Sequence, residues 1–443
     1  MNGKFMRRIG KAAAVLAGAS LLLTGCGGGT PATPPTGSPT AAPTGADAEP
    51  VTITFGWWGG DARAEQTQQV IEAFQTKYPH ITVEPQYTDW NGYWDQLATL
   101  TAAGDAPDVS QMDELYLASY GQRGALLDLD TVSIDTSSHS PEALATGQLS
   151  GTQYAIPHSV TTFAIVANTD LFEKYGVAMP DDETWSWDDY AALAKELTDK
   201  SNGEINGSTQ IGGFDMGNIK HWAHSADNYI FDEEGNVSLD PQVLADLWQF
   251  QLDMIDSGAM QSAPAIVESF NAGISAGALA TGKVALGAQW NTQITALTDA
   301  SGATLELLKL PEPEGKNPAS LKPGMYWAIS SKSEHPAEAA LLVDFLINSQ
   351  EAADIIKTER GIPANEAIRA SIAGSLSDTD AKAVAFLDRV EMGATPVVTP
   401  NGASGIEGML QRYTQEVFAG QKQPLPAAEE FVKELQGEID AAK

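Results

Sequence analysis

The sequence repeats one local pattern, a strand followed by a turn and an amphipathic helix, and this repeat limits the fold more than any other feature. Residues 51–55 alternate apolar and polar side chains, segment 56–60 is rich in glycine, and Val70, Ile71 and Phe74 then follow a helical spacing. We expect further strands at 81–85 and 107–113 and a helix at 94–103. Alternating strands and helices predict an α/β fold with a largely parallel sheet.

Aromatic and acidic side chains fall where these strands are expected to end. Trp57, Trp58, Trp90 and Asp113 lie at or just after such ends, and ligands of open α/β sheets bind beyond the carboxyl ends of the strands. Aromatic planes bind the apolar C–H face of a pyranose, while carboxylates and amides bind its hydroxyl rim. The sequence therefore favours a carbohydrate site.

The size and charge of the chain narrow the choice of fold and partner. Roughly 390 residues follow position 50, more than one hydrophobic core usually serves, so we expect two lobes. With 25 basic against 58 acidic residues the formal net charge is -33, and no cluster of lysine and arginine is evident. Because phosphate backbones and acidic ligands need such a cluster, we expect no nucleic acid partner and favour a neutral ligand.

The N-terminus has the features of a secretion signal. Segment 1–26 carries four basic and no acidic residues, and its apolar run is too short to span a membrane. It ends in Leu23-Thr24-Gly25-Cys26, which resembles the bacterial lipobox, so we predict that Cys26 receives a diacylglycerol. The alternative is an incidental thiol in a cleaved signal. Cys26 is the only cysteine, so we expect no disulfide, and the Gly, Pro and Thr content of segment 27–50 predicts a disordered tether.

A series of short motifs runs through the rest of the chain. They are Gly151 with Tyr154-Ala155-Ile156-Pro157, Asn168-Thr169-Asp170-Leu171-Phe172, Thr184-Trp185-Ser186-Trp187-Asp188-Asp189, Gly282-Lys283-Val284-Ala285-Leu286 with Trp290, Ile329-Ser330-Ser331-Lys332-Ser333, and Gly361-Ile362-Pro363-Ala364. No single motif is diagnostic, but the ordered series resembles the family-1 extracellular solute-binding proteins. The resemblance covers essentially all of residues 51–443.

This resemblance implies a two-lobed fold like that of periplasmic binding proteins, with three hinge crossings and a ligand cleft between the lobes. The crossings are expected near 159–161, 326–328 and 360–362. One lobe is then formed by 51–159 plus 328–360 and the other by 160–327 plus 361–443.

The resemblance also implies a function. The expected protein captures a mono- to oligosaccharide between closing lobes and delivers it to the permease subunits of an ABC importer; polyols and glycerol phosphate esters stay open as ligands. We expect a monomer without a cofactor. Its lipid is expected to hold it at the extracellular face of the cytoplasmic membrane, or on the periplasmic side if the cell has an outer membrane.

We predict the ligand-binding side chains mainly among tryptophans outside apolar runs and the polar residues beside them. They are Trp57, Trp58, Asp61, Trp90, Asp113, Thr161, Asp215, Trp222, Trp290, Asn291, Tyr326 and Trp327. Asp113 and Trp290 match positions where the resembled family places a ligand-binding acid and a ligand-side tryptophan. Core packing is an equal alternative for Trp58 and Trp222, and it is the preferred interpretation for Trp94, Trp185, Trp187 and Trp248.

Signs of catalysis or metal binding are weak. The chain has no Gly-x-Ser-x-Gly elbow and no P-loop, and acid pairs such as Asp188-Asp189 suit helix N-termini. His221 and His224 have the spacing of a metal pair but no evident third ligand, and acidic segment 232–236 fits a turn better than a calcium loop. We therefore expect neither an enzyme nor a metal site. The alternatives are a surface lipoprotein enzyme acting on carbohydrate, such as a hydrolase or lyase, and a receptor subunit that reports its ligand to a sensor.

Overall fold

The computed structural model describes residues 49–393 and 397–443. The lipidation site predicted at Cys26, the signal segment 1–26 and most of the tether predicted at 27–50 lie outside these residues. Within the described ranges, no helix combines the length and the apolar character needed to cross a membrane.

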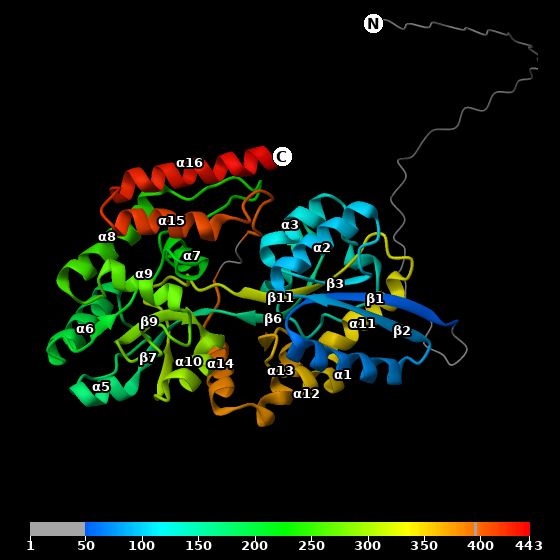
Figure 1. Cartoon of the computed structure of the whole chain (residues 1–443), viewed down its shortest axis with the longest axis horizontal. Helices are drawn as coiled ribbons and strands as arrows, with labels where there is room; N and C mark the ends of the chain where they lie inside the picture. The colour runs from blue at the N-terminus through cyan, green and yellow to red at the C-terminus, as the bar shows by residue number, and fades with distance from the viewer. Residues whose placement is uncertain (1–48, 394–396) are drawn as a thin grey trace, which may run out of the picture. The chain divides into compact units, whose positions relative to one another are not determined.

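The first sheet has six strands in the order β12-β6-β11-β3-β1-β2 (Figure 1). They are β1 Val51–Trp58, β2 Ile81–Thr88, β3 Val109–Met112, β6 Ile156–Thr161, β11 Lys322–Ile329 and β12 Ile362–Pro363. β1 pairs in parallel with β2 and β3, whereas β11 pairs antiparallel with β3 and β6. The parallel part confirms the predicted strand and helix repeat. Three of the five pairings in this sheet are antiparallel, so the expectation of a largely parallel sheet was wrong.

Helices cover both faces of this sheet. α2 (Trp90–Ala103) and α3 (Glu114–Gln122) lie on one face, and α1 (Asp61–Lys77), α11 (Pro336–Asn348) and α12 (Gln350–Ile356) lie on the other (Figure 1). α2 begins one turn before its predicted start, where the Asp89 carboxylate accepts a hydrogen bond from the Gly92 amide (3.2 Å). The remaining elements near this sheet are α4 Pro141–Ala145, α13 Glu366–Ile372 and the hairpin of β4 Gln148–Leu149 with β5 Thr152–Gln153. We call this sheet and its helices the first lobe.

The second sheet has four strands in the order β10-β7-β9-β8. They are β7 Phe163–Asn168, β8 Asn206–Ser208, β9 Val284–Trp290 and β10 Leu305–Leu308. The helices of this second lobe are α5 Thr169–Tyr175, α6 Trp187–Lys200, α7 Met216–Ser225, α8 Pro241–Ser257, α9 Ala263–Ala272, α10 Ile294–Ser301, α14 Asp378–Arg389, α15 Ile406–Phe418 and α16 Pro424–Ala442. Short 3-10 turns occupy Leu129–Thr131, Asn291–Gln293 and Ala373–Ser375.

Two of the recognised motifs begin helices in the second lobe. Asn168 caps α5 by accepting a hydrogen bond from the Leu171 amide (3.2 Å). Ser186 and Asp189 form a capping box at the start of α6, so the paired acids there serve the helix N-terminus as predicted.

The described residues pass between the two sheets three times. Thr162 alone separates β6 from β7, which agrees with the first expected crossing. β11 pairs within the first sheet from Lys322 onward, so the second passage ends there and not near 326–328. α13 contacts α12 while α14 contacts β10, which moves the third passage from 360–362 to the segment after Ile372. The division of the whole chain into lobes at the predicted boundaries stays a prediction.

Candidate functional site

A cluster of buried charges joins the two lobes. Glu114 opens α3 in the first lobe, and its carboxylate lies 3.7 Å from the Lys220 ammonium on α7 in the second lobe. A second lysine, Lys322 at the start of β11, lies 3.6 Å from the same carboxylate. Burial by itself raises the pKa of Glu114, but the two lysines outweigh it and hold this pKa below its usual value. Glu114 is therefore the ionised centre of a contact between the lobes.

Three more carboxyl groups surround Lys322. Burial favours the neutral amine of Lys322, yet the field of Glu114, Asp113, Glu407 and Asp215 raises its pKa. Asp113 caps α3 by accepting a hydrogen bond from the Leu115 amide (3.0 Å), and burial raises its pKa. Burial likewise raises the pKa of Glu407 on α15. The cluster holds more carboxyl groups than lysines, which suits hydroxyl donors better than anions.

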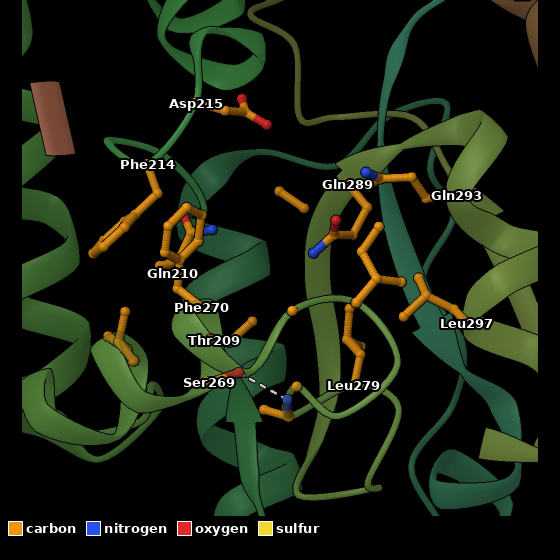
Figure 2. A pocket seen from close by; sticks show the side chains of 16 residues that line it. Thr209, Gln210, Phe214, Asp215, Ser269, Phe270, Leu279, Gln289, Gln293 and Leu297 are labelled. Carbon is orange, nitrogen blue, oxygen red and sulfur yellow. Dashed lines mark hydrogen bonds between the residues drawn. The ribbon is translucent and has the colours of Figure 1, made fainter. Parts of the chain in front are cut away.

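A cavity of about 310 Å³ opens beside α7 in the second lobe. Asp215 caps α7 by accepting a hydrogen bond from the Gly217 amide (2.6 Å), and burial raises its pKa to about 6. Figure 2 shows Asp215 at one end of the cavity, with Phe214 and Phe270 on one side and the amides of Gln289 and Gln293 on the other. Rings facing amides and a carboxylate offer an apolar surface and hydrogen-bond partners to the same ligand.

Trp290 lies between the cavity and the charge cluster. Its ring packs edge-on against Phe163, with centroids 4.8 Å apart, and the Lys322 ammonium lies 5.7 Å from the ring centroid. Trp290 follows Gln289 on β9, and its side chain also lowers the pKa of Asp215 through a hydrogen bond, against the larger effect of burial. The structure thus brings the predicted residues Asp113, Asp215 and Trp290 together around Lys322.

An aromatic cluster lies at the first turns of α2 and α3, beyond the carboxyl ends of β2 and β3. Trp90 is 38% exposed, and its ring packs edge-on against Trp58 (4.9 Å) and Trp94 (5.5 Å). Trp94 in turn stacks on Tyr116 at 3.8 Å. Burial, and after it the Asp113 carboxylate, raise the pKa of Tyr116, so this aromatic cluster adjoins the charge cluster. Trp90 is the most exposed ring of the cluster.

The sequence profile described as bacterial extracellular solute-binding protein matches residues 60–353, which is more than half of the chain. The chain belongs to this family. Two relatives are similar at the sequence level. An uncharacterized lipoprotein of Streptomyces antibioticus is 28% identical over 186 residues, which is 40% of this chain and 37% of the relative. An uncharacterized ABC transporter extracellular-binding protein of Pyrococcus horikoshii is 27% identical over 191 residues, 42% of this chain and 41% of the relative, so the chain spans less than half the length of either relative.

Solved structures of solute-binding proteins match nearly the whole chain. The family 1 protein of Alicyclobacillus acidocaldarius superposes with a TM-score of 0.74 at 24% identity, over 89% of this chain and 100% of that one. The periplasmic oligogalacturonide binding protein of Yersinia enterocolitica gives 0.76 at 23% identity, over 88% and 99%. A Listeria monocytogenes substrate-binding protein, solved in complex with cycloalternan, gives 0.70 at 22% identity, over 88% and 100%. This likeness confirms the two-lobed α/β fold.

Three predicted ligand residues of this solute-binding protein lie in the core of the first lobe. Trp57 is buried and stacks on Tyr87 (5.4 Å), and the Tyr326 hydroxyl donates to the Thr146 carbonyl (2.8 Å). Trp327 is 0% exposed and its Nε1 donates to His158 Nδ1 (3.0 Å). β1 and β11 are interior strands covered on both faces, so these side chains offer no surface to a ligand in this structure.

Asn291 and Thr161 form part of the first passage between the sheets. The Asn291 carbonyl oxygen accepts hydrogen bonds from the Thr161 hydroxyl (2.6 Å) and the Thr162 amide (3.1 Å), and its amide donates to the Ala383 carbonyl (3.0 Å). Asn291 is fully buried, so its polar atoms are used within the protein. This geometry gives both residues a positioning role at the hinge instead of direct ligand contact.

Trp222 and Asp61 lie outside the charge cluster and the cavity beside α7. The Trp222 ring packs against Trp187 (5.4 Å) and Phe250 (5.6 Å) on helices α6 and α8. Asp61 is an exposed residue in the first turn of α1, where its charge complements the helix dipole. Trp222 therefore packs between helices, which is the alternative interpretation given for it above. The fully buried Trp248 also packs in the core.

The most informative residues of the site were missed at the sequence level. Lys220 and Lys322 lie far apart in the sequence, so no local cluster of lysines marks them. Glu114 had one available signal, because it directly follows the predicted Asp113. Glu407 and Gln293 lie in no sequence pattern that separates them from other glutamates and glutamines of the chain.

The histidine pair and the acidic segment have structural roles. His221 Nε2 lies 3.0 Å from the Pro311 carbonyl, and His224 Nδ1 lies 3.1 Å from the Pro318 carbonyl. The Asn236 amide donates to the Asp232 carboxylate (2.7 Å), which closes the predicted turn. Across residues 49–393 and 397–443, no group of three or more His, Cys, Asp or Glu side chains is arranged to hold a metal ion.

Proposed function

We propose that this solute-binding protein captures a carbohydrate between its lobes and delivers it to an ABC importer. The observation that carries the proposal is the charge cluster that joins the lobes. The Glu114 carboxylate of the first lobe contacts the Lys220 ammonium of the second lobe. Lys322 contacts the same carboxylate and feels the charges of Asp113 and Asp215. A ligand between these groups contacts both lobes at once.

The side chains around this cluster suit a sugar. Trp90 and Trp290 supply aromatic surfaces on the first and second lobe, while the carboxylates and the amides of Gln289 and Gln293 supply partners for hydroxyl groups. Structures of the same fold from Yersinia and Listeria are described with oligogalacturonide and cycloalternan. That likeness supports a saccharide as the ligand class.

Closure of the lobes supplies the transport signal in this proposal. Contacts that exist only when both lobes touch the sugar favour the closed state, and only that state docks productively with the permease. The hydrogen bonds of Asn291 to Thr161 and Thr162 keep the first passage in a fixed register while the lobes move. The protein binds its ligand without converting it. Cys26 carries the lipid that holds the monomer at the outer face of the cytoplasmic membrane.

The test is a thermal-shift screen of the purified protein against mono-, di- and oligosaccharides, with amino acids and polyol phosphates as controls. A ligand at a hundredfold excess over its Kd stabilises the native state by about 2.7 kcal/mol. The expected result is a shift with one class of sugar, and chromatography of the recovered sugar showing no product. A shift only with the control solutes, or turnover of the sugar, contradicts the proposal. Uptake of the labelled sugar by vesicles carrying the permease then tests delivery.

A further inference from the structure

A second concave surface lies outside the charge cluster, between α2 and α3 of the first lobe. This groove has a volume of about 630 Å³. Its lining includes Trp94, Thr101, Tyr116, Tyr120 and Arg123. None of them belongs to the cavity beside α7.

The topology of the sheet shows which end of the groove lies toward the interlobe site. α2 follows β2 and α3 follows β3, and both strands run parallel to β1. Both helices therefore start at the same edge of the sheet, where the aromatic cluster lies. Thr101 and Arg123 mark their other ends, so the groove leads away from the interlobe site along the first lobe.

Aromatic rings continue from the exposed Trp90 into the groove. Trp90 packs edge-on against both Trp94 (5.5 Å) and Tyr116 (6.2 Å), and these two rings line the groove. Tyr120, one helical turn further along α3, lies 6.3 Å from Trp94. A chain of sugar units lying along these rings meets the same kind of surface from the cleft edge into the groove.

Two buried polar atoms of the groove lack partners. Trp94 Nε1 and Thr101 Oγ1 have no hydrogen-bond partner among the described residues, and Trp94 is only 7% exposed. Buried donors and acceptors are nearly always satisfied, because an unmade hydrogen bond costs about 1 to 3 kcal/mol. Both residues line the groove, so a hydroxyl-rich ligand that reaches these atoms there supplies the missing partners. Its charged lining side chains are Asp95, Arg123 and Lys332, so charges of both signs are available to the hydroxyl groups of a sugar.

We propose that the groove binds the protruding end of a linear, neutral oligosaccharide whose other end lies in the interlobe site. This inference rests on the proposed function and extends it, because it assigns the protein to oligosaccharides instead of monosaccharides. Affinity should then rise with chain length beyond the units held between the lobes.

The experiment is calorimetry with the preferred sugar as a series from the disaccharide to the hexasaccharide. Thr101→Val removes the unpartnered hydroxyl and keeps the shape of the side chain, and Tyr120→Ala removes a ring that is only partly buried. Thr298→Val is the matched control, because Thr298 Oγ1 on α10 is also buried without a partner but does not line the groove.

The wild type and Thr298→Val should bind the longer sugars more tightly than the disaccharide. Thr101→Val should weaken the hexasaccharide by about 3- to 10-fold and leave the disaccharide unchanged, since one hydrogen bond is lost. Tyr120→Ala should also reduce the increase in affinity from the disaccharide to the hexasaccharide. An unchanged length dependence in both variants, or no length dependence in the wild type, overturns the groove proposal while disaccharide binding upholds the proposed function. Absence of binding by every sugar overturns both.

Discussion

The carboxylate of Glu114 on α3 and the ammonium of Lys220 on α7 lie 3.7 Å apart across the two lobes, and each side chain is only 12% exposed. Among the ion pairs of the described residues, it is the one in which neither side chain is more than 12% exposed. The pair holds the facing surfaces of the two lobes together. It also makes the stability of this contact depend on the charge state of both side chains.

Glu114→Gln should destabilise the protein. The change leaves Lys220 and Lys322 without their shared carboxylate partner, and an uncompensated buried charge of this kind costs about 3 kcal/mol. Urea denaturation measures the difference in the free energy of unfolding. The exposed Glu429→Gln on α16 serves as the control and should unfold like the wild type. Equal stability of the two variants speaks against the ion-pair role.

Trp290→Ala should weaken sugar binding by roughly 10-fold, because it removes an aromatic surface beside Lys322. Titration calorimetry with the sugar found by the thermal screen measures the loss. Trp222→Ala is the matched control, since Trp222 is also partly buried but packs on α6 and α8. Similar affinities for the two variants remove Trp290 from the site.

Trp327→Ala should act on folding before binding. Its fully buried ring packs on Phe55 at 5.3 Å and its Nε1 bonds His158, so truncation leaves a cavity and an unpaired partner. The expected cost is about 3 to 5 kcal/mol in the free energy of unfolding. Thermal melting with and without sugar checks this. A variant that melts like the wild type but no longer binds sugar contradicts the folding role and supports a ligand-binding role for Trp327.

Asp215 should make the stability depend on pH. Burial raises its pKa to about 6 in the folded protein, above the ordinary value of 3.8, with Glu407 nearby adding to the rise. The folded state therefore holds this proton more tightly than the unfolded state, so its contribution to stability falls as the pH rises from about 4 to 6. Above pH 6 the ionised carboxylate costs its full desolvation.

Asp215→Asn isolates this effect, because asparagine still caps α7. Denaturation curves from pH 4 to 7 should show the wild type losing stability relative to the variant across that window. Parallel curves for the two proteins mean that Asp215 titrates as it does in the unfolded chain. The neighbouring groups Lys322, Glu407 and Trp290 are present in both proteins, so the difference between the curves reports Asp215.

Local sequence patterns predicted many of the strands and helices of the first lobe. The strand and helix repeat over β1, α1 and β2 depends on side chains a few positions apart, as does the capping of α5 by Asn168. Asp113 was placed at the end of a strand for the same reason. The start of β11 at Lys322 was not predicted, because nothing within 309–321 marks where this strand begins to pair with β3 and β6.

Short-range periodicity and motifs in fixed order were enough to predict the α/β class, the order of most elements and the family, and they singled out Asp113, Asp215 and Trp290 as candidates. The tertiary structure determines which tryptophans are buried, since Trp57 and Trp327 pack against neighbouring strands and the helices over them. It alone brought Lys220 and Lys322 to Glu114. Electrostatic attraction acts through space, and distance along the chain does not reveal which charges will meet.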